Sequence, residues 1–293
     1  MIWLIGNKGM LGTEVANLLT REGFSWVGSD RETDIRDPAA LRGWLDASAG
    51  GNRQPIDWIV NCSAYTAVDK AEDEEELARG INALGAANIA RFAATIGARL
   101  IHISTDYVFR GDGTRPYMET DPVDPQGAYG RTKAEGESLV ANLCPHNFTI
   151  RTAWLYGQHG PNFVDTMLRL MRERDSIGVV ADQYGTPTWA FDLAQAIVAI
   201  IRREPASSGI YHFTNAGQTT WFEFATEIQC LGLAHGLLDH ACSIKPLTTA
   251  EYPTKARRPA YSVLSKDKII AAGIALPEWK ESLRKFMEAH RHG

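Results

Sequence analysis

Short apolar runs alternate with longer amphipathic stretches through the first half of the chain. The apolar runs predict strands, and the stretches between them predict helices. We expect strands over residues 3–5, 26–28, 58–62, 100–104 and 149–152, and helices over residues 10–22, 38–46, 73–96 and 129–143. Two runs, 58–60 and 100–103, are almost continuously apolar, which is typical of strands buried on both faces of a parallel sheet. The pattern therefore predicts an α/β fold with a doubly wound parallel sheet.

After residue 157 the rhythm loosens into segments punctuated by proline and glycine. Helices are expected over residues 162–174, 190–203, 221–231 and 278–290. We interpret residues 1–156 as one domain and residues 157–293 mainly as a smaller C-terminal α/β lobe, with some segments returning to the first domain.

Composition narrows the class of partner. The 293 residues are 44% hydrophobic and 22% charged, as in ordinary folded soluble proteins. A net charge of -5 gives no overall field for nucleic acid or an anionic membrane, so we expect neither as a partner. The apolar runs are shorter than the ~20 residues that cross a bilayer. Four widely spaced cysteines without a Cys-x-x-Cys pair favour reduced thiols and a cytoplasmic protein.

The first expected strand leads directly into a turn with the pattern Gly-x-x-Gly-x-x-Gly. Its glycines are Gly6, Gly9 and Gly12, and Met10 and Leu11 open the helix that follows. Glycines at such a turn let the backbone approach a pyrophosphate, which the helix N-terminus then stabilises. The turn predicts that residues 1–156 form an NAD(P)-binding domain of the Rossmann type.

An acidic residue lies eighteen positions beyond Gly12. Asp30 ends the second expected strand, where a carboxylate can accept hydrogen bonds from the adenosine ribose and so favour NAD. Arg31 follows it, and a guanidinium can pair with the 2′-phosphate of NADP. The pair leaves both NADH and NADPH open.

Tyr129 and Lys133 form a Tyr-x-x-x-Lys pattern on an expected helix, so their side chains share one face. Ser104 and Thr105 end a buried strand upstream, where open α/β sheets place their ligands. A lysine ammonium near the phenol would lower the pKa of Tyr129. Such a phenol can exchange a proton with a substrate oxygen near neutral pH.

Together these motifs resemble the extended short-chain dehydrogenase/reductases. Within that group the chain is similar to the dTDP-4-dehydrorhamnose reductase family. The closer resemblance is carried by residues 60–72, 104–109, 182–188 and 252–259, which span nearly the whole chain. Two departures are Cys62-Ser63, where the family pattern has two alanines, and Lys255, where it has proline. Neither departure removes a reacting group.

The resemblance implies that NADPH or NADH reduces the C4 keto group of a dTDP-sugar while Tyr129 protonates the new alkoxide. It implies that Lys133 holds the nicotinamide ribose and that Thr105 bonds the substrate carbonyl. The cofactor would be surrounded by Gly6, Gly9, Met10, Leu11, Gly12, Asp30, Arg31, Ser63, Ala64, Tyr65, Tyr129 and Lys133. The sugar nucleotide would contact Thr66, Val68, Thr105, Trp154, Arg257 and Arg258.

The second-half residues also have ordinary structural readings. Arg257 and Arg258 could clamp a diphosphate bidentately, which a net-negative protein needs locally, or they could be solvated surface residues. Trp154 could be a core residue instead of a wall for the sugar. Thr66 and Asp69 could form a helix capping box as readily as a substrate contact.

Three alternative functions stay open at this point: a different sugar-nucleotide 4-ketoreductase, an epimerase, and a nonenzymatic regulatory subunit of this fold. The 4-ketoreductase and the epimerase would use the same Thr, Tyr and Lys. A dehydratase would carry Asp-Glu after the threonine, whereas this chain has Asp106-Tyr107. A nonenzymatic regulatory subunit of this fold would be expected to lack the Thr105-Asp106 pair.

The family also includes magnesium-dependent dimers, but no compact carboxylate cluster identifies a Mg²⁺ site, and a homodimer is left open.

Overall fold

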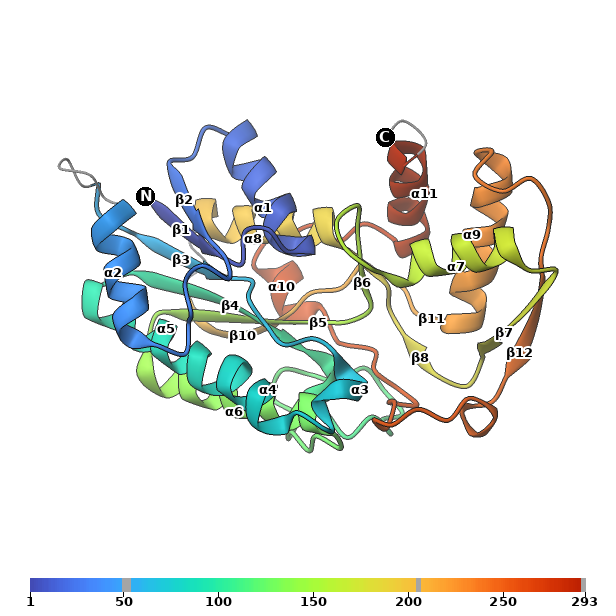
Figure 1. Cartoon of the computed structure of the whole chain (residues 1–293), viewed down its shortest axis with the longest axis horizontal. Coiled ribbons are helices and arrows are strands. Elements are labelled where there is room, and N and C mark those ends of the chain that lie inside the picture. The colour runs from blue at the N-terminus through green and yellow to red at the C-terminus, as the bar shows by residue number, and fades with distance from the viewer. Residues whose placement is uncertain (49–53, 204–206, 291–293) are drawn as a thin grey trace.

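The central sheet confirms the expected doubly wound α/β class. The computed structural model describes residues 1–48, 54–203 and 207–290. In these ranges six parallel strands pair in the order β10-β5-β4-β3-β1-β2 (Figure 1). They are β1 (Ile2–Ile5), β2 (Trp26–Ser29), β3 (Trp58–Asn61), β4 (Arg99–Thr105), β5 (Asn147–Thr152) and β10 (Gly209–His212). The order reverses beside β1, where doubly wound sheets bind their ligands.

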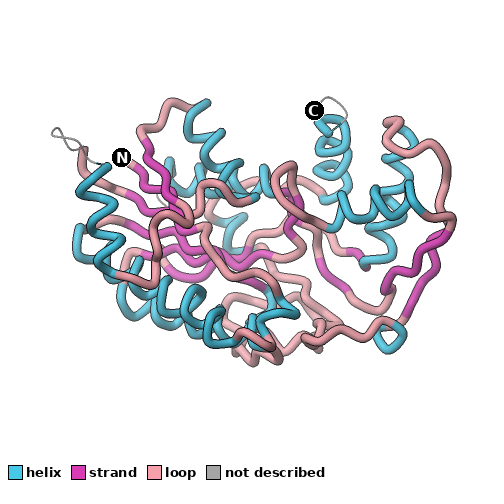
Figure 2. Tube along the Cα trace, in the orientation of Figure 1, coloured by secondary structure: helices cyan, strands magenta, loops and turns pink. Residues whose placement is uncertain are grey.

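Helices cover both faces of this sheet (Figure 2). Side chains alternate along β1, so Ile2 and Leu4 join one apolar layer and Trp3 and Ile5 join the other. The first layer is covered by α1 (Met10–Arg21), α8 (Ala190–Arg203) and α10 (Asp267–Ala271). The second is covered by α2 (Pro38–Ser48), α5 (Ala86–Ile96) and α6 (Ala128–Leu143). The strands are therefore buried on both faces.

A second apolar cluster forms the smaller lobe on the right of Figure 1. Its helices are α7 (Phe163–Glu173), α9 (Trp221–Ala234) and α11 (Trp279–His290). Short strands pair as β6 (Leu155–Tyr156) with β9 (Thr188–Trp189), β7 (Ser176–Val180) with β12 (Ser243–Leu247), and β8 (Tyr184–Gly185) with β11 (Thr219–Thr220). Strand β10, which the sequence pattern did not predict, and helix α8 follow residue 157 yet join the central sheet and its cover.

The helix expected over residues 73–96 is confirmed as one continuous helical run over residues 75–96, but it is not α-helical throughout. It consists of α4 (Glu75–Arg79), a π-helical segment, Gly80–Gly85, and α5, and the short helix α3 (Val68–Ala71) precedes it. Asn82 in this segment bonds Tyr65 and Thr132 through its side chain. Its carbonyl lies so close to Gly136 of α6 that a Cβ there would be 2.2 Å from the oxygen. These tertiary contacts favour the wider turn, and apolar periodicity does not register them.

The contact between Asn82 and Gly136 generates a stability prediction. Gly136→Ala should lower the free energy of unfolding by about 2–3 kcal/mol, because backbone occupies the space that the methyl group needs. Gly43→Ala in α2 is the control, since nothing lies within 4 Å of its Cβ position. The control should raise stability by about 0.5–1 kcal/mol. Urea unfolding measures both, and equal stabilities would contradict the close approach.

Candidate active site

The glycine turn after β1 is shaped for close backbone approach. Gly6 has a φ of 79°, in the left-handed region. A Cβ on Gly12 would lie 1.9 Å from the Gly6 carbonyl oxygen. Helix α1 begins at Met10 with Gly9 as its N-cap, without a side-chain cap or an acidic residue in the first turn. The N–H groups of that turn, which includes Leu11, therefore fit the pyrophosphate of a dinucleotide.

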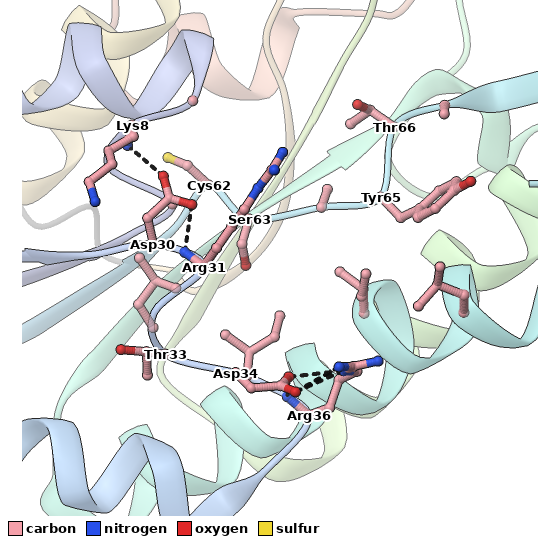
Figure 3. A pocket seen from close by; sticks show the side chains of 18 of the residues that line it. Lys8, Asp30, Arg31, Thr33, Asp34, Arg36, Cys62, Ser63, Tyr65 and Thr66 are labelled. Atoms are coloured by element: carbon pink, nitrogen blue, oxygen red, sulfur yellow. Dashed lines mark hydrogen bonds and ion pairs between the residues drawn. The ribbon is translucent and has the colours of Figure 1, made fainter. Parts of the chain in front are cut away.

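A cavity of about 930 Å³ opens beside this turn (Figure 3). Its wall combines the glycine turn, the segment after β2 and the loop after β3. It brings together many of the residues expected around the cofactor, with Thr66 beside them: Gly6, Gly9, Asp30, Arg31, Ser63, Ala64 and Tyr65. Tyr129 and Lys133 do not line this cavity.

The Asp30 carboxylate connects the segment after β2 with the glycine turn (Figure 3). It accepts hydrogen bonds from the backbone N–H groups of Lys8 at 3.1 Å and Arg31 at 2.8 Å. Arg31 is exposed and lines the cavity, and in the described ranges it has no carboxylate partner. Arg36, also in the wall, is paired with Asp34 at 2.7 Å. Arg31 is thus available for an anionic group.

The loop after β3 is fixed by two asparagines. Asn61 accepts hydrogen bonds at Oδ1 from the Ser63 N–H at 3.0 Å and the Ser63 hydroxyl at 2.5 Å. The Asn82 side chain accepts from the Tyr65 N–H at 2.9 Å and donates to the Tyr65 carbonyl at 3.1 Å. The Tyr65 hydroxyl donates to Glu74 at 2.5 Å. Neither asparagine could be identified from the sequence pattern, since their partners are set by tertiary contacts.

Helix α6 carries the Tyr-x-x-x-Lys pair, and its first turn is held from outside. Its N-cap, Gly127, offers no side chain. The Glu72 carboxylate instead accepts a hydrogen bond from the Ala128 N–H at 2.8 Å. A carboxylate at this end also suits the helix dipole. Glu72 therefore helps to fix the start of the helix one residue before Tyr129.

Lys133 is buried one helical turn after Tyr129 on α6. Its Nζ donates to the Ile103 carbonyl at 2.6 Å and lies 3.4 Å from Nε2 of His102. Burial holds the pKa of His102 well below its usual value, so this ring is neutral. The Asn61 amide donates to Nδ1 of His102 at 3.1 Å. Hydrogen-bonded side chains thus connect Lys133 with the loop that carries Ser63.

The pKa shifts overturn one expectation. Burial raises the pKa of Tyr129 above its usual value, partly opposed by hydrogen bonding with Thr105. The predicted lowering is therefore wrong for the chain on its own. The Lys133 amine is directed at the Ile103 carbonyl, and burial lowers its own pKa to about 8.

Thr105 lies at the carboxyl end of β4 beside a buried carboxyl group. Its hydroxyl donates to Asp106 at 3.0 Å and accepts from the Tyr107 N–H at 3.2 Å. Burial raises the pKa of Asp106 to about 6, although hydrogen bonds from Thr105 and Ser262 lower it. Ser104, the preceding residue, is buried, and its hydroxyl has no partner in the part of the chain that the structure describes.

Trp154 is a half-buried residue with a strained backbone. Its φ of 48° is the one positive value at a non-glycine among the described residues. The ring stacks on Trp221 with centroids 3.5 Å apart. A Cβ on Gly185 would lie 2.5 Å from the Trp154 ring, so glycine there makes room for it. Such strain persists where the surroundings impose it, and it gathers at ligand sites.

The two arginines near the C-terminus have different surroundings. Arg257 is exposed, and its guanidinium contacts Gln126 at 3.4 Å. Arg258 donates to the Asp69 carboxylate at 2.6 Å. Asp69 and Thr66 form no capping box, because α3 begins at Val68 with Ala67 as its N-cap and has no side-chain cap.

The raised pKa of Asp106 predicts a pH-dependent stability. The pKa of Asp106 is higher in the folded chain than in the unfolded chain, so the free energy of unfolding falls as pH rises from 3.8 to about 6. Asp106→Asn removes the ionisable group and with it this fall in stability. Relative to wild type, the variant should gain up to about 3 kcal/mol in free energy of unfolding between about pH 4 and about pH 7.

Urea unfolding at both pH values measures this difference. Asp239→Asn, at an exposed position in the other lobe, is the control. A difference between Asp106→Asn and wild type that does not change with pH would show that the Asp106 carboxyl group is not desolvated.

No three His, Cys, Asp or Glu side chains in residues 1–48, 54–203 and 207–290 are grouped so that they could hold a metal ion. Over the same ranges, no helix combines the length and apolar character needed to span a membrane.

Comparisons with known proteins identify the family. The family model described as "RmlD substrate binding domain" matches residues 1–292. A dTDP-4-dehydrorhamnose reductase of Streptomyces griseus is 41% identical over 98% of this chain and 93% of its own. A probable dTDP-4,6-dihydroxy-2-methyloxan-3-one 4-ketoreductase of Streptomyces antibioticus is 42% identical over 97% and 94%. The crystal structure of dTDP-4-dehydrorhamnose reductase from Bacillus anthracis str. Ames in complex with NADP has a TM-score of 0.89 and 36% identity, covering 98% of each chain. The chain belongs to the RmlD substrate binding domain family.

Proposed function

We propose that the chain reduces the C4 keto group of dTDP-4-dehydro-L-rhamnose to give dTDP-L-rhamnose, with NADPH or NADH as reductant. The observation that carries this proposal is the position of Tyr129 and Lys133. They lie one turn apart on α6, next to Thr105 at the carboxyl end of β4. The cavity beside the glycine turn opens at the same edge of the sheet. The names of the reductases that match nearly the whole chain support it.

The residues of the cavity are proposed to hold the cofactor. The glycine turn and the first N–H groups of α1 would bind the pyrophosphate, because no side chain of the turn competes for them. Asp30 would accept from the adenosine ribose, and Arg31 would bind a 2′-phosphate. Ser63, Ala64 and Tyr65 would complete the wall, and Met10 and Leu11, which do not line the cavity, would contact the cofactor from the first turn of α1. Bound reduced nicotinamide supplies the hydride that adds to the carbonyl carbon.

Residues of the chain would supply the proton that the C4 oxygen of the substrate gains. The Tyr129 hydroxyl would donate its proton to the C4 oxygen as that oxygen becomes an alkoxide. Thr105 would hydrogen-bond the same oxygen and keep the carbonyl against the phenol. Lys133, anchored on the Ile103 carbonyl, would hold the nicotinamide ribose. A phenol whose pKa is raised by burial stays protonated near neutral pH, as a donor must.

The sugar nucleotide is proposed to contact residues from both lobes. Trp154 would pack against the sugar, with its ring held by Trp221. Arg257, which is exposed, would bind the diphosphate. Thr66 and Val68 would contact the substrate at the start of α3.

A second candidate is reduction of a different dTDP-4-keto sugar. The Streptomyces antibioticus relative favours it, because its name gives another 4-keto substrate at similar identity. Relative rates with dTDP-4-dehydrorhamnose and with other dTDP-4-keto sugars separate the two. We also propose a cytoplasmic location, supported by four cysteines that are not joined by disulfides in the described ranges. A homodimer stays a prediction.

Turnover of the 4-keto sugar tests the proposal. Wild-type protein should oxidise NADPH or NADH in the presence of dTDP-4-dehydrorhamnose, followed by nicotinamide absorbance. Tyr129→Phe should lower kcat by about 10²- to 10⁴-fold, the contribution of a positioned acid, with little change in cofactor affinity. Tyr252→Phe, at a phenol that is 57% exposed, is the control. A Tyr129→Phe variant with the wild-type rate would remove Tyr129 from the reaction.

The preference for NADH or NADPH tests the proposed roles of Asp30 and Arg31. Asp30→Ala should weaken NADH more than NADPH, since the lost hydrogen bonds go to a ribose hydroxyl that only NADH carries. Arg31→Ala should do the reverse, because it removes the partner of the 2′-phosphate. Fluorescence titration with each cofactor measures both. Asp239→Ala, at an exposed position in the other lobe, is the control. Equal losses with both cofactors would place Asp30 and Arg31 outside the ribose site.

A further inference from the structure

A segment near the C-terminus is attached to the dinucleotide-binding half through one carboxylate. Asp69 of α3 accepts hydrogen bonds from the Ala256 N–H at 3.0 Å and from Nη2 of Arg258 at 2.6 Å. Lys255, between them, pairs with Asp73 at the exposed surface. The Asp69 carboxylate thus holds both the backbone and the side chain of residues that lie far away in the sequence.

The Arg258 guanidinium interacts electrostatically with Tyr107 as well as with Asp69. Its side chain is 22% exposed, and its Nη1 is buried without a hydrogen-bond partner in the part of the chain that the structure describes. The guanidinium is close enough to lower the pKa of the Tyr107 phenol, against the larger effect of burial, which takes that pKa up to about 12. Arg258 is therefore an internal neighbour of Tyr107 as well as the partner of Asp69.

Tyr107 contacts three residues of the candidate active site, Tyr129, Thr105 and Gly130. Its ring meets the Tyr129 ring edge to face, with centroids 5.5 Å apart and planes at 72°. Its N–H donates to the Thr105 hydroxyl at 3.2 Å. Its carbonyl lies against Gly130, where a Cβ would be 2.2 Å from the oxygen. A displacement of Tyr107 would therefore displace both Tyr129 and Thr105.

We propose that Tyr107 is a positioning residue for Tyr129 and Thr105, and that Asp69 and Arg258 hold it in place. This inference rests on the proposed function. It gives Arg258 a role that differs from the clamp expected for both arginines. Arg258 acts on the reacting phenol through Tyr107, and Arg257 alone is left for the diphosphate. Changes at Arg258 then reduce kcat, since they misplace the proton donor, and leave the KM of the sugar nucleotide nearly unchanged.

A double-mutant cycle in the intact protein tests the connection. Tyr107→Phe keeps the ring but removes the hydroxyl that interacts electrostatically with Arg258. Tyr107→Phe and Arg258→Ala should each lower kcat by about 10- to 100-fold, because small displacements of a reacting group have effects of this size. If Arg258 acts through Tyr107, the double variant should be no worse than the poorer single variant by more than about twofold.

Two further variants complete the cycle. Asp69→Asn should lower kcat in the same direction, since it loses the ion pair to Arg258 but can still accept from the Ala256 N–H. Lys255→Ala is the matched control, because it breaks the exposed pair in the same segment. Its kcat should stay within about twofold of wild type, as for most surface ion pairs. The KM for NADPH should not move in any variant.

Three outcomes would overturn the positioning role. One is an Arg258→Ala variant with wild-type kcat and a KM for the sugar nucleotide raised about tenfold, which would make it a direct clamp. Another is a double variant whose loss is the product of the single losses. The third is wild-type kcat in Tyr107→Phe, which is decisive even if Arg258→Ala fails to fold. A wild-type protein without turnover would instead overturn the proposed function itself, and this role with it.

Discussion

Because the six strands of the central sheet run parallel, their carboxyl ends meet at one edge, and the rest of the site depends on that edge. The sheet order reverses beside β1, so the turn after β1 lies next to the loop after β3. These two backbones approach so closely that a Cβ on Gly6 would lie 2.8 Å from the Ser63 nitrogen. Glycine at position 6 is therefore what lets the turn and the loop form one cavity wall. Strand β4 ends at the same edge and delivers Thr105.

Burial controls the chemistry of the groups collected there. Lys133, Asp106 and His102 are almost fully buried, so each loses hydration in its charged form. The pKa values of Lys133 and His102 are lowered, and that of Asp106 is raised. Each group is therefore held by hydrogen bonds to fixed partners and not by strong ion pairs. Burial likewise raises the pKa of the Tyr129 phenol, so this group is protonated near neutral pH.

Local patterns predicted the parts of the site that lie close together in the chain. The glycine turn, Asp30 at the end of β2, and the Tyr129–Lys133 spacing follow from strand and helix periodicity. Contacts between distant segments could not be predicted in this way. Glu72 holds the start of α6, and Asp69 holds Arg258, although neither pair is related by any repeat or spacing. The π-helical segment around Asn82 and the raised pKa of Tyr129 also arise from packing, which a single sequence does not display.

The central claim is that this edge of the sheet directs reduction to one carbon of a sugar nucleotide. The most direct measurement uses NADPH that carries deuterium at both C4 positions of the nicotinamide, with dTDP-4-dehydrorhamnose as substrate and NMR of the isolated product. The account predicts one deuterium at C4 of the product sugar for each NADPH oxidised. Deuterium at another sugar carbon, or a product without deuterium while NADPH is consumed, would contradict it.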